Sequence, residues 1–528
     1  MPSIINEDIK VDVTMHEEQS GPTLVEDSTP EYLSWSLTTT YAKFWKSVTY
    51  CILVIFGAVF DGYALTVPGN LIAQAAFVKQ FGTVIGPAGD LELNALHVSA
   101  WGALLTVGQI VGMGVGPFIS DWMGRKVAMW GLAVALVVAA VLEIAAREWR
   151  VYAVAKLFAG IGTGMVQSGL TVYVAEVAPA RIRGALLSSY SLFFGVGQII
   201  GSVALNIIAD QNQYRTVFYS EFAFLGLFLP ALLFAPESPW WAIRRGKKDL
   251  AKQQMRRLYS NVPSYDVEKE YLVLEALIAG EDGATAASNW KQYAECFKGS
   301  NWRRTYISFL PLAFQQFLGI ALFFGYATYF FALAGYPHPF LASLIQGLIL
   351  LGFMFLSFFV IDKFGRRPLL LWGGVVMAIC TLATGAIGFM DVLPGAALVA
   401  LTCIWTASYA ISAGPLGWTY IAETPTPQLR AKTTGMAAIG TCLFGLIFNY
   451  TVPIMLSAQQ ANWGPKIGLF FGGLTLLGLA VLYFLVPETK GRTYPQLDEM
   501  FQAKIPARKF GTYLCQGQSR GHAAVETA

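Results

Sequence analysis

The stretch DWMGRK (residues 121–126) returns 241 residues later as DKFGRR (residues 362–367). Each copy lies in a short polar gap between two long apolar runs, which predicts a tight turn between two membrane helices. Glycine permits such a turn because it has no side chain to restrict the backbone. The acidic and basic residues on either side of it are placed to bridge neighbouring helix ends.

Two further pairs of motifs recur at nearly the same offset: Glu176 with Arg183 and Glu423 with Arg430, then Pro236-Glu237-Ser238 and Pro487-Glu488-Thr489. Three matches in register predict that one six-helix unit is used twice. Two parallel halves with a site between them are typical of rocking transporters.

The composition places the chain in a membrane. Of its 528 residues, 55% are hydrophobic and 13% are charged, about half the charged share of a soluble domain. So few charges exclude a soluble globule, and so much apolar sequence excludes disorder. The net charge of +3 is small and no basic patch is visible, so nucleic acid is excluded as a partner.

Twelve apolar runs reach the roughly 20 residues that a helix needs to cross a bilayer. They lie near residues 48–69, 97–119, 127–147, 151–174, 185–207, 216–235, 305–333, 339–361, 369–390, 395–421, 433–457 and 464–486. The sequence therefore predicts an all-α membrane protein, with twelve transmembrane helices in two pseudo-symmetric six-helix bundles.

The predicted organisation has five parts. They are an N-terminal tail (1–47), a six-helix bundle (48–235), a helical linker (236–304), a second six-helix bundle (305–486) and a C-terminal tail (487–528). Both tails are expected to lack structure. Most of the 36 Lys and Arg fall on the side of the tails and the linker, so these parts are expected to be cytoplasmic. We expect a multi-pass protein of the plasma membrane.

The repeated charges suggest a gating network at the cytoplasmic ends of the helices. Its predicted members are Asp121, Arg125, Glu176, Arg183, Glu237, Asp362, Arg366, Arg367, Glu423, Arg430 and Glu488. Ion pairs that form only when the cytoplasmic side is closed would favour the outward-open state. The alternative is that the basic residues simply anchor the chain by the positive-inside rule.

Several motifs resemble the sugar porter family of the major facilitator superfamily. They are DWMGRK, AEVAPARIRGAL, PESPWW, QQFLGI, DKFGRRP, GPLGWTYIAET and PETKGRTYPQLDEMF, and the resemblance covers about residues 45–505. The stretches VFDGYALTVPGNLIAQAAFVKQFG and GYATYFFALAGY are similar to fungal maltose and α-glucoside permeases. The resemblance implies the major facilitator fold and a sugar transporter working by alternating access, with proton symport as the preferred energetics.

Departures from the family pattern leave the energetics and the cargo open. The Glu-Gly-Tyr-Asp core of such permeases is Asp61-Gly-Tyr63-Ala64 here, so its second carboxylate is missing. The Glu often found in the second span is Gln109, and the Arg that opens the fourth span is Lys156. Facilitated diffusion is therefore an alternative to symport. A polyol or a fungal secondary metabolite is an alternative to maltose, another α-glucoside or a hexose.

A sugar site needs amides and hydroxyls for the sugar hydroxyls and an aromatic face for the ring. The candidates are Gln315, Gln316, Tyr326, Trp418 and Asn449. Adjacent residues on a helix point about 100° apart, so one of the two glutamines is expected to face the cargo. A helix break is expected at the Gly-Pro step just before Trp418. The alternative for each aromatic is packing or lipid contact.

Asp61 is the candidate for proton coupling. It lies thirteen residues into the first span, and ionisable groups at such depth are costly and usually functional. Burial favours its protonated form, which suits a proton carrier. A structural, hydrogen-bonded carboxyl is the alternative.

Three other ionisable residues fall within apolar runs. Glu143 stands four residues before Arg147, which predicts an i,i+4 ion pair. Glu221 is expected to be structural. Lys156 is expected to pair with Asp61 or with Glu176, and the sequence leaves both open.

No enzymatic constellation, phosphate-binding loop or metal-ligand cluster is visible in the sequence. We expect no enzyme activity, no cofactor and no metal. The expected partners are a small-molecule sugar, protons and the lipid bilayer, and the expected state is a monomer. A non-transporting sugar sensor on the same fold is the competing hypothesis.

Overall fold

The computed structural model describes residues 35–513 apart from short gaps. The gaps are residues 87, 88, 90, 180, 210, 212, 263, 264, 285–292, 391, 427, 428 and 493. The side chains of residues 280–284, 362, 431, 494 and 495 also lie outside the described part. Residues 1–34, which make up most of the predicted N-terminal tail, lie outside the described part altogether.

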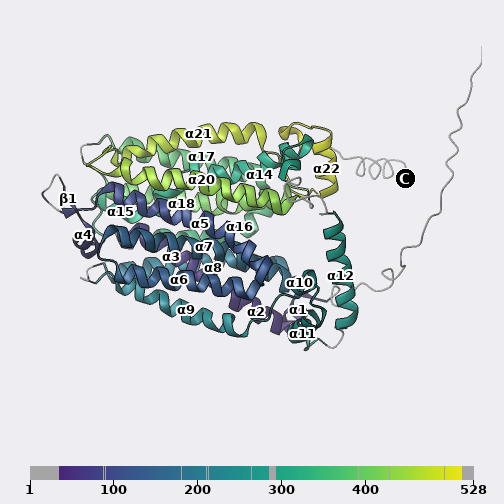
Figure 1. Cartoon of the computed structure of the whole chain (residues 1–528). Coiled ribbons are helices and arrows are strands. Elements are labelled where there is room, and N and C mark those ends of the chain that lie inside the picture. The colour runs from purple at the N-terminus through teal and green to yellow at the C-terminus, as the bar shows by residue number, and fades with distance from the viewer. Residues whose placement is uncertain are drawn as a thin grey trace, which may run out of the picture.

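The first half consists of long helices that run back and forth along one axis (Figure 1). In chain order its elements are α1 (Leu37–Lys43), α2 (Trp45–Ile55), α3 (Gly57–Leu71), α4 (Ala75–Phe81), β1 (Val84–Ile85), β2 (Leu91–Glu92), α5 (Ala95–Met123), α6 (Arg125–Ala145), α7 (Trp149–Val177), α8 (Arg183–Ile207) and α9 (Thr216–Phe234). Strands β1 and β2 form a small antiparallel hairpin. The long apolar helices satisfy their backbone hydrogen bonds internally, as a bilayer requires.

The second half repeats this plan with two divided helices. Its elements are α14 (Gly299–Phe317), the π-helical turn η2 (Ala321–Gly325), α15 (Ala327–Leu333), α16 (Pro339–Phe364), α17 (Arg366–Ile387), α18 (Gly395–Ile411), α19 (Ala413–Glu423), α20 (Arg430–Leu456), η3 (Gly464–Lys466) and α21 (Ile467–Leu485). The break between α18 and α19 falls at Ser412, close to the predicted Gly-Pro step.

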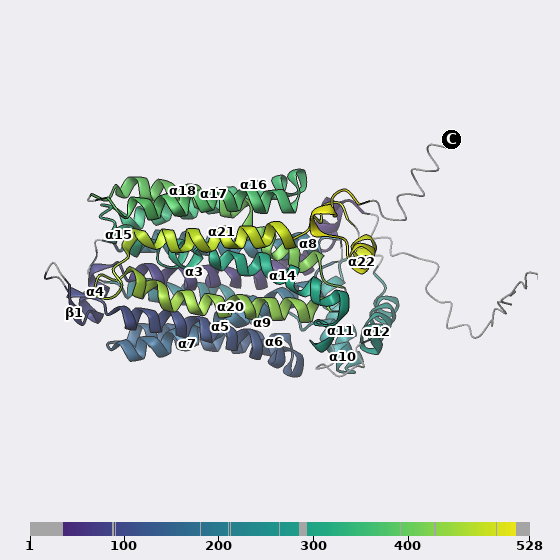
Figure 2. The same ribbon diagram turned by 90° about the horizontal axis from the view of Figure 1, so that it is seen from above.

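The two ends of the molecule differ (Figures 1 and 2). One end carries the linker helices α10 (Pro239–Arg244), α11 (Lys248–Tyr259) and α12 (Val267–Ala284), with the C-terminal α22 (Tyr494–Gln502) and η4 (Ala507–Lys509). We call it the linker end. The opposite end carries α4 and the β1–β2 hairpin, and we call it the hairpin end.

The seventh predicted span, residues 305–333, differs from a continuous helix. Among the described residues, 11 helices are long and apolar enough to cross a membrane, and this segment is not one of them. Gly319 adopts a φ of 88° and η2 follows, so the segment is divided into α14, η2 and α15. Figure 1 places α15 at the hairpin end, so the divided segment still runs the length of the bundle.

The expectation that both tails lack structure is wrong for α1 and the start of α2 in the N-terminal tail, and for α22 and η4 in the C-terminal tail. Leu497, Met500 and Phe501 are buried in a cluster with Ile307 at the base of α14. The guanidinium of Arg508 lies 4.4 Å from each of the Tyr483 and Phe484 rings. This part of the tail therefore packs on the linker end of the second half.

Candidate functional site: repeated charge clusters and the interface between the halves

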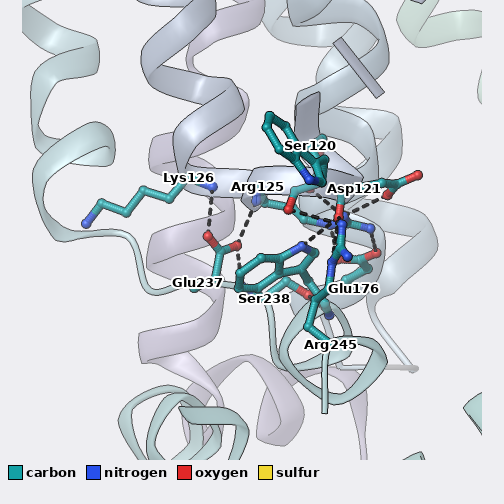
Figure 3. Close-up of polar contacts among 10 residues, drawn as sticks. Ser120, Asp121, Arg125, Lys126, Glu176, Glu237, Ser238 and Arg245 are labelled. Atoms are coloured by element: carbon teal, nitrogen blue, oxygen red, sulfur yellow. Dashed lines mark hydrogen bonds and ion pairs between the residues drawn. The ribbon is translucent and has the colours of Figure 1, made fainter. Parts of the chain in front are cut away.

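A charge cluster around Arg125 joins three helices of the first half (Figure 3). Its guanidinium donates to both carboxylate oxygens of Glu176 on α7, at 2.9 and 2.6 Å. It also donates to Asp121 at the end of α5, at 2.8 Å. Arg125 is 3% exposed and Glu176 is 11% exposed. Such shielded, bidentate pairing is stronger than a surface ion pair.

Glu237 caps the first turn of α6. Its carboxylate accepts from the backbone N–H of Arg125 at 2.9 Å and of Lys126 at 3.1 Å. These N–H groups have no partner within the helix, and a negative charge beside them is favourable. Gly124, with a φ of 117°, makes the turn that brings the carboxylate this close.

Linker helix α10 attaches to the same place. The Trp241 indole donates to the carbonyl of Asp121 at 3.0 Å, and the Arg245 guanidinium donates to the same carbonyl at 2.8 Å. The linker therefore completes the C-terminal end of α5 as part of the first half.

The second half repeats the cluster with equivalent residues. The Arg366 guanidinium donates to Glu423 at 3.2 Å. Glu488 accepts from the backbone N–H of Arg366 at 3.0 Å and of Arg367 at 2.9 Å. Gly365, with a φ of 92°, makes the turn. The repeat read from the sequence is thus also a repeat of contacts.

The structure brings together eight of the eleven predicted gating residues. Arg183 and Arg430 are the first residues of α8 and α20, and no described carboxylate forms an ion pair with Arg183. The side chain of Asp362 lies outside the described part. Each cluster joins helices of one half, so neither bridges the two halves through its described members.

A buried charged group within the first half was missed in the sequence. The Lys156 ammonium donates to Glu143 at 2.5 Å, and Glu221 interacts with both residues. All three side chains are buried. The predicted Glu143–Arg147 pair is wrong because α6 ends at Ala145, before Arg147. The predicted pairing of Lys156 with Asp61 or Glu176 is also wrong, because the Lys156 ammonium is bonded to Glu143 instead. The sequence signal that could have predicted this ion pair is the opposite charge of Glu143 and Lys156 on two consecutive spans.

Asp61 is buried between three helices of the first half. One carboxylate oxygen accepts from the Tyr190 hydroxyl on α8 at 2.7 Å, and the other accepts from the Gln167 amide on α7 at 3.3 Å. No described cation contacts it. The carboxyl therefore has only neutral partners.

The two adjacent glutamines of α14 differ in their surroundings. The Gln315 amide donates to the carbonyls of Ala413 and Gly414, at 2.8 and 3.1 Å. Both carbonyls belong to the first residues of α19, so the amide ties α14 to the start of α19 just after the break. Gln316 is partly exposed beside Gly445 of α20, and no described residue forms a hydrogen bond with its side chain.

The remaining sugar candidates lie on the second half. The Tyr326 hydroxyl donates to the carbonyl of Asn449 at 3.1 Å, and the Asn449 amide reaches Thr106 of the first half at 3.1 Å. Trp418 on α19 is 54% exposed. A further candidate is Gln198 on α8, whose buried amide oxygen has no described partner. It could not be found from the sequence, because burial without a partner is a property of the folded chain.

Contacts between the halves gather at the hairpin end and at mid-depth. Asn70 bonds to Thr328 at 3.0 Å, and Glu92 bonds to Gln459 at 2.8 Å. At mid-depth Gly195 and Gly347 are the close points, facing Leu351 and Ile199 across the interface. No hydrogen bond between described residues joins the halves at the linker end. The hairpin end is therefore closed by direct contact.

The fold, the repeated clusters and the polar interface define a two-half membrane transporter. The sequence matches the model of the family described as "Sugar (and other) transporter" over residues 50–501. The chain belongs to this family of transporters, and it is an integral, multi-pass membrane protein.

The sequences of known relatives agree with this membership, and a solved structure agrees with the fold. The chain is 28% identical to a general alpha-glucoside permease of Saccharomyces cerevisiae over 94% of this chain and 82% of that protein. It is 26% identical to hexose transporter 2 of Kluyveromyces lactis over 88% and 84% of the two chains. A partially occluded, inward-open structure of the xylose transporter XylE from E. coli matches with a TM-score of 0.68 at 24% identity, covering 86% of this chain and 100% of that one.

Proposed function

We propose that the protein carries an α-glucoside or a hexose across the membrane together with protons. The observation that carries this proposal is Asp61, a fully buried carboxyl in the first half with a hydroxyl and an amide as its partners. Ionising such a group inside a membrane is costly without a cation. It therefore suits a group that binds a proton in one state of the cycle and releases it in another.

The cargo would meet polar and aromatic side chains that remain available to bind it. Gln316 offers an amide with no described protein partner, and Gln198 offers a buried amide oxygen without one. Asn449 spans the two halves, and Trp418 offers an exposed ring. Amides and an aromatic face are the groups that a sugar needs. Gln315 would support the site by holding the α18–α19 break in place.

We place the linker end in the cytoplasm and the hairpin end outside the cell. The excess of Lys and Arg in the tails and the linker supports this orientation. In this orientation the hairpin end, which is closed by direct contact, would be the closed outer side of the protein. The plasma membrane is the proposed location.

The test is uptake of radiolabelled maltose and glucose by cells that lack their own sugar carriers. It is run at pH 5 and pH 7, with and without a protonophore, for the wild type, Asp61→Asn and Glu268→Gln. The last variant is a control, because Glu268 is an exposed linker residue. We expect uptake that rises at pH 5 and collapses with protonophore or with Asp61→Asn alone.

Other outcomes point elsewhere. Uptake that ignores pH, protonophore and Asp61→Asn would mean facilitated diffusion and a structural Asp61. Absence of uptake of either sugar, with the protein shown at the cell surface, would contradict the sugar assignment and favour another cargo or a sensing role.

A further inference from the structure

Two glycines bring the backbones of the two halves into contact at the hairpin end. Gly69 lies in α3, and Gly325 ends η2 in the divided seventh segment. A Cβ atom added to Gly69 would lie 1.8 Å from the carbonyl oxygen of Gly325, far inside van der Waals contact. Only glycine at this position allows so close an approach.

The division of the seventh segment leaves a backbone donor in need of a partner beside this contact. Thr328 is the second residue of α15, and the first N–H groups of a helix have no acceptor within it. The π-helical turn does not supply one, because it ends with Tyr326 bonded back to Ala321.

Asn70 of the first half supplies the missing acceptor. Its side-chain oxygen accepts from the backbone N–H of Thr328 at 3.0 Å. Its amide nitrogen donates to the carbonyl of Thr66 at 2.8 Å, which orients the oxygen towards α15. The side chain is 3% exposed. One half of the protein thus completes the hydrogen bonding of a broken helix in the other half.

We propose that Asn70 is a positioning residue of the transport cycle, which stabilises the closed hairpin end by capping α15 across the interface. The bond joins the two halves, so it must break whenever the hairpin end opens. A side-chain cap of this kind contributes about 1 kcal/mol, which corresponds to about a fivefold change in the ratio of open to closed molecules. The Gly69–Gly325 contact sets the distance at which the cap can form.

The inference uses the two-half architecture and not the identity of the cargo, so it can fail independently of the proposed function. The measurement is the distance between spin labels across the hairpin end, by pulsed electron paramagnetic resonance, in purified full-length protein without sugar. The labels are placed at Ile85→Cys and Val392→Cys, which are 73% and 82% exposed. The six native cysteines are replaced beforehand.

We expect Asn70→Ala to raise the ratio of long to short distances about fivefold. Asn70→Asp keeps an acceptor and should stay within about twofold of the wild type. Thr66→Ala is the matched control, because its hydroxyl bonds only within α3, to the Gly62 carbonyl. It should leave the distribution unchanged.

A second variant guards against failure of Asn70→Ala to fold. Gly69→Ala blocks the close approach without touching the Asn70 amide, and it should shift the distances in the same direction. The proposal is overturned if folded Asn70→Ala gives the wild-type distribution, or if Thr66→Ala shifts it as much as Asn70→Ala does. If only Gly69→Ala can be purified, an unchanged distribution overturns it equally.

Discussion

Gly124 and Gly365 are the residues on which the two repeated turns depend. Both have a positive φ, and a Cβ added to either would meet the carboxylate that caps the next helix, at 2.5 Å from Glu237 and 2.8 Å from Glu488. We expect Gly124→Ala and Gly365→Ala each to destabilise the protein by about 1–3 kcal/mol. The measurement is the apparent melting temperature in detergent. Gly114→Ala, whose added Cβ meets nothing within 4 Å, is the control and should not lower it.

Lys156 offers a second test at the residue scale. Lys156→Met leaves Glu143 and Glu221 buried without their cation, and removing one partner of a buried pair costs about 3–5 kcal/mol. We expect a large fall in the apparent melting temperature, partly recovered by adding Glu143→Gln. The comparison is Glu268→Gln in the Lys252–Glu268 pair, where Glu268 is 59% exposed and a loss below about 1 kcal/mol is expected. Equal effects at the two pairs would contradict this reading.

At the scale of elements, the broken helix α18–α19 separates the roles of two neighbouring side chains. Gln315→Leu removes two hydrogen bonds to the Ala413 and Gly414 carbonyls, and a buried hydrogen bond contributes about 0.5–1.5 kcal/mol. We therefore expect a lower apparent melting temperature. Gln316→Leu removes no described hydrogen bond, so stability should persist while the KM for sugar uptake rises roughly tenfold. The reverse pattern, with stability lost only in Gln316→Leu, would contradict the assignment.

The orientation proposed for the whole molecule rests on the distribution of basic residues and can be tested without disturbing the proposed site. Ile85→Cys in the hairpin should react with a membrane-impermeant maleimide in intact cells. Arg256→Cys on the exposed face of linker helix α11 should react only after the cells are permeabilised. Labelling of the linker position in intact cells would reverse the predicted orientation.

Much of the architecture was predictable because apolar runs and turn motifs recur at regular intervals along the sequence. Long apolar runs and repeated turn motifs can be recognised in local sequence. The register of the repeat alone matches Arg125 with Arg366 and Glu237 with Glu488. The predictions failed where the partner is set by packing. Lys156 meets Glu143 across the turn between two spans, and Leu497 of α22 packs in a cluster with Ile307, 190 residues earlier in the chain.

The two charge clusters contain equivalent residues but differ in how far they are shielded from solvent. This difference predicts which half of the protein opens locally first. Arg125 and Glu176 are 3% and 11% exposed, whereas Arg366 and Glu423 are 16% and 26% exposed. Dissolved ions screen exposed charges more than buried ones. Raising the salt concentration should therefore speed amide hydrogen exchange in the first turn of α17 before that of α6. The second half would then be the first to lose its protection.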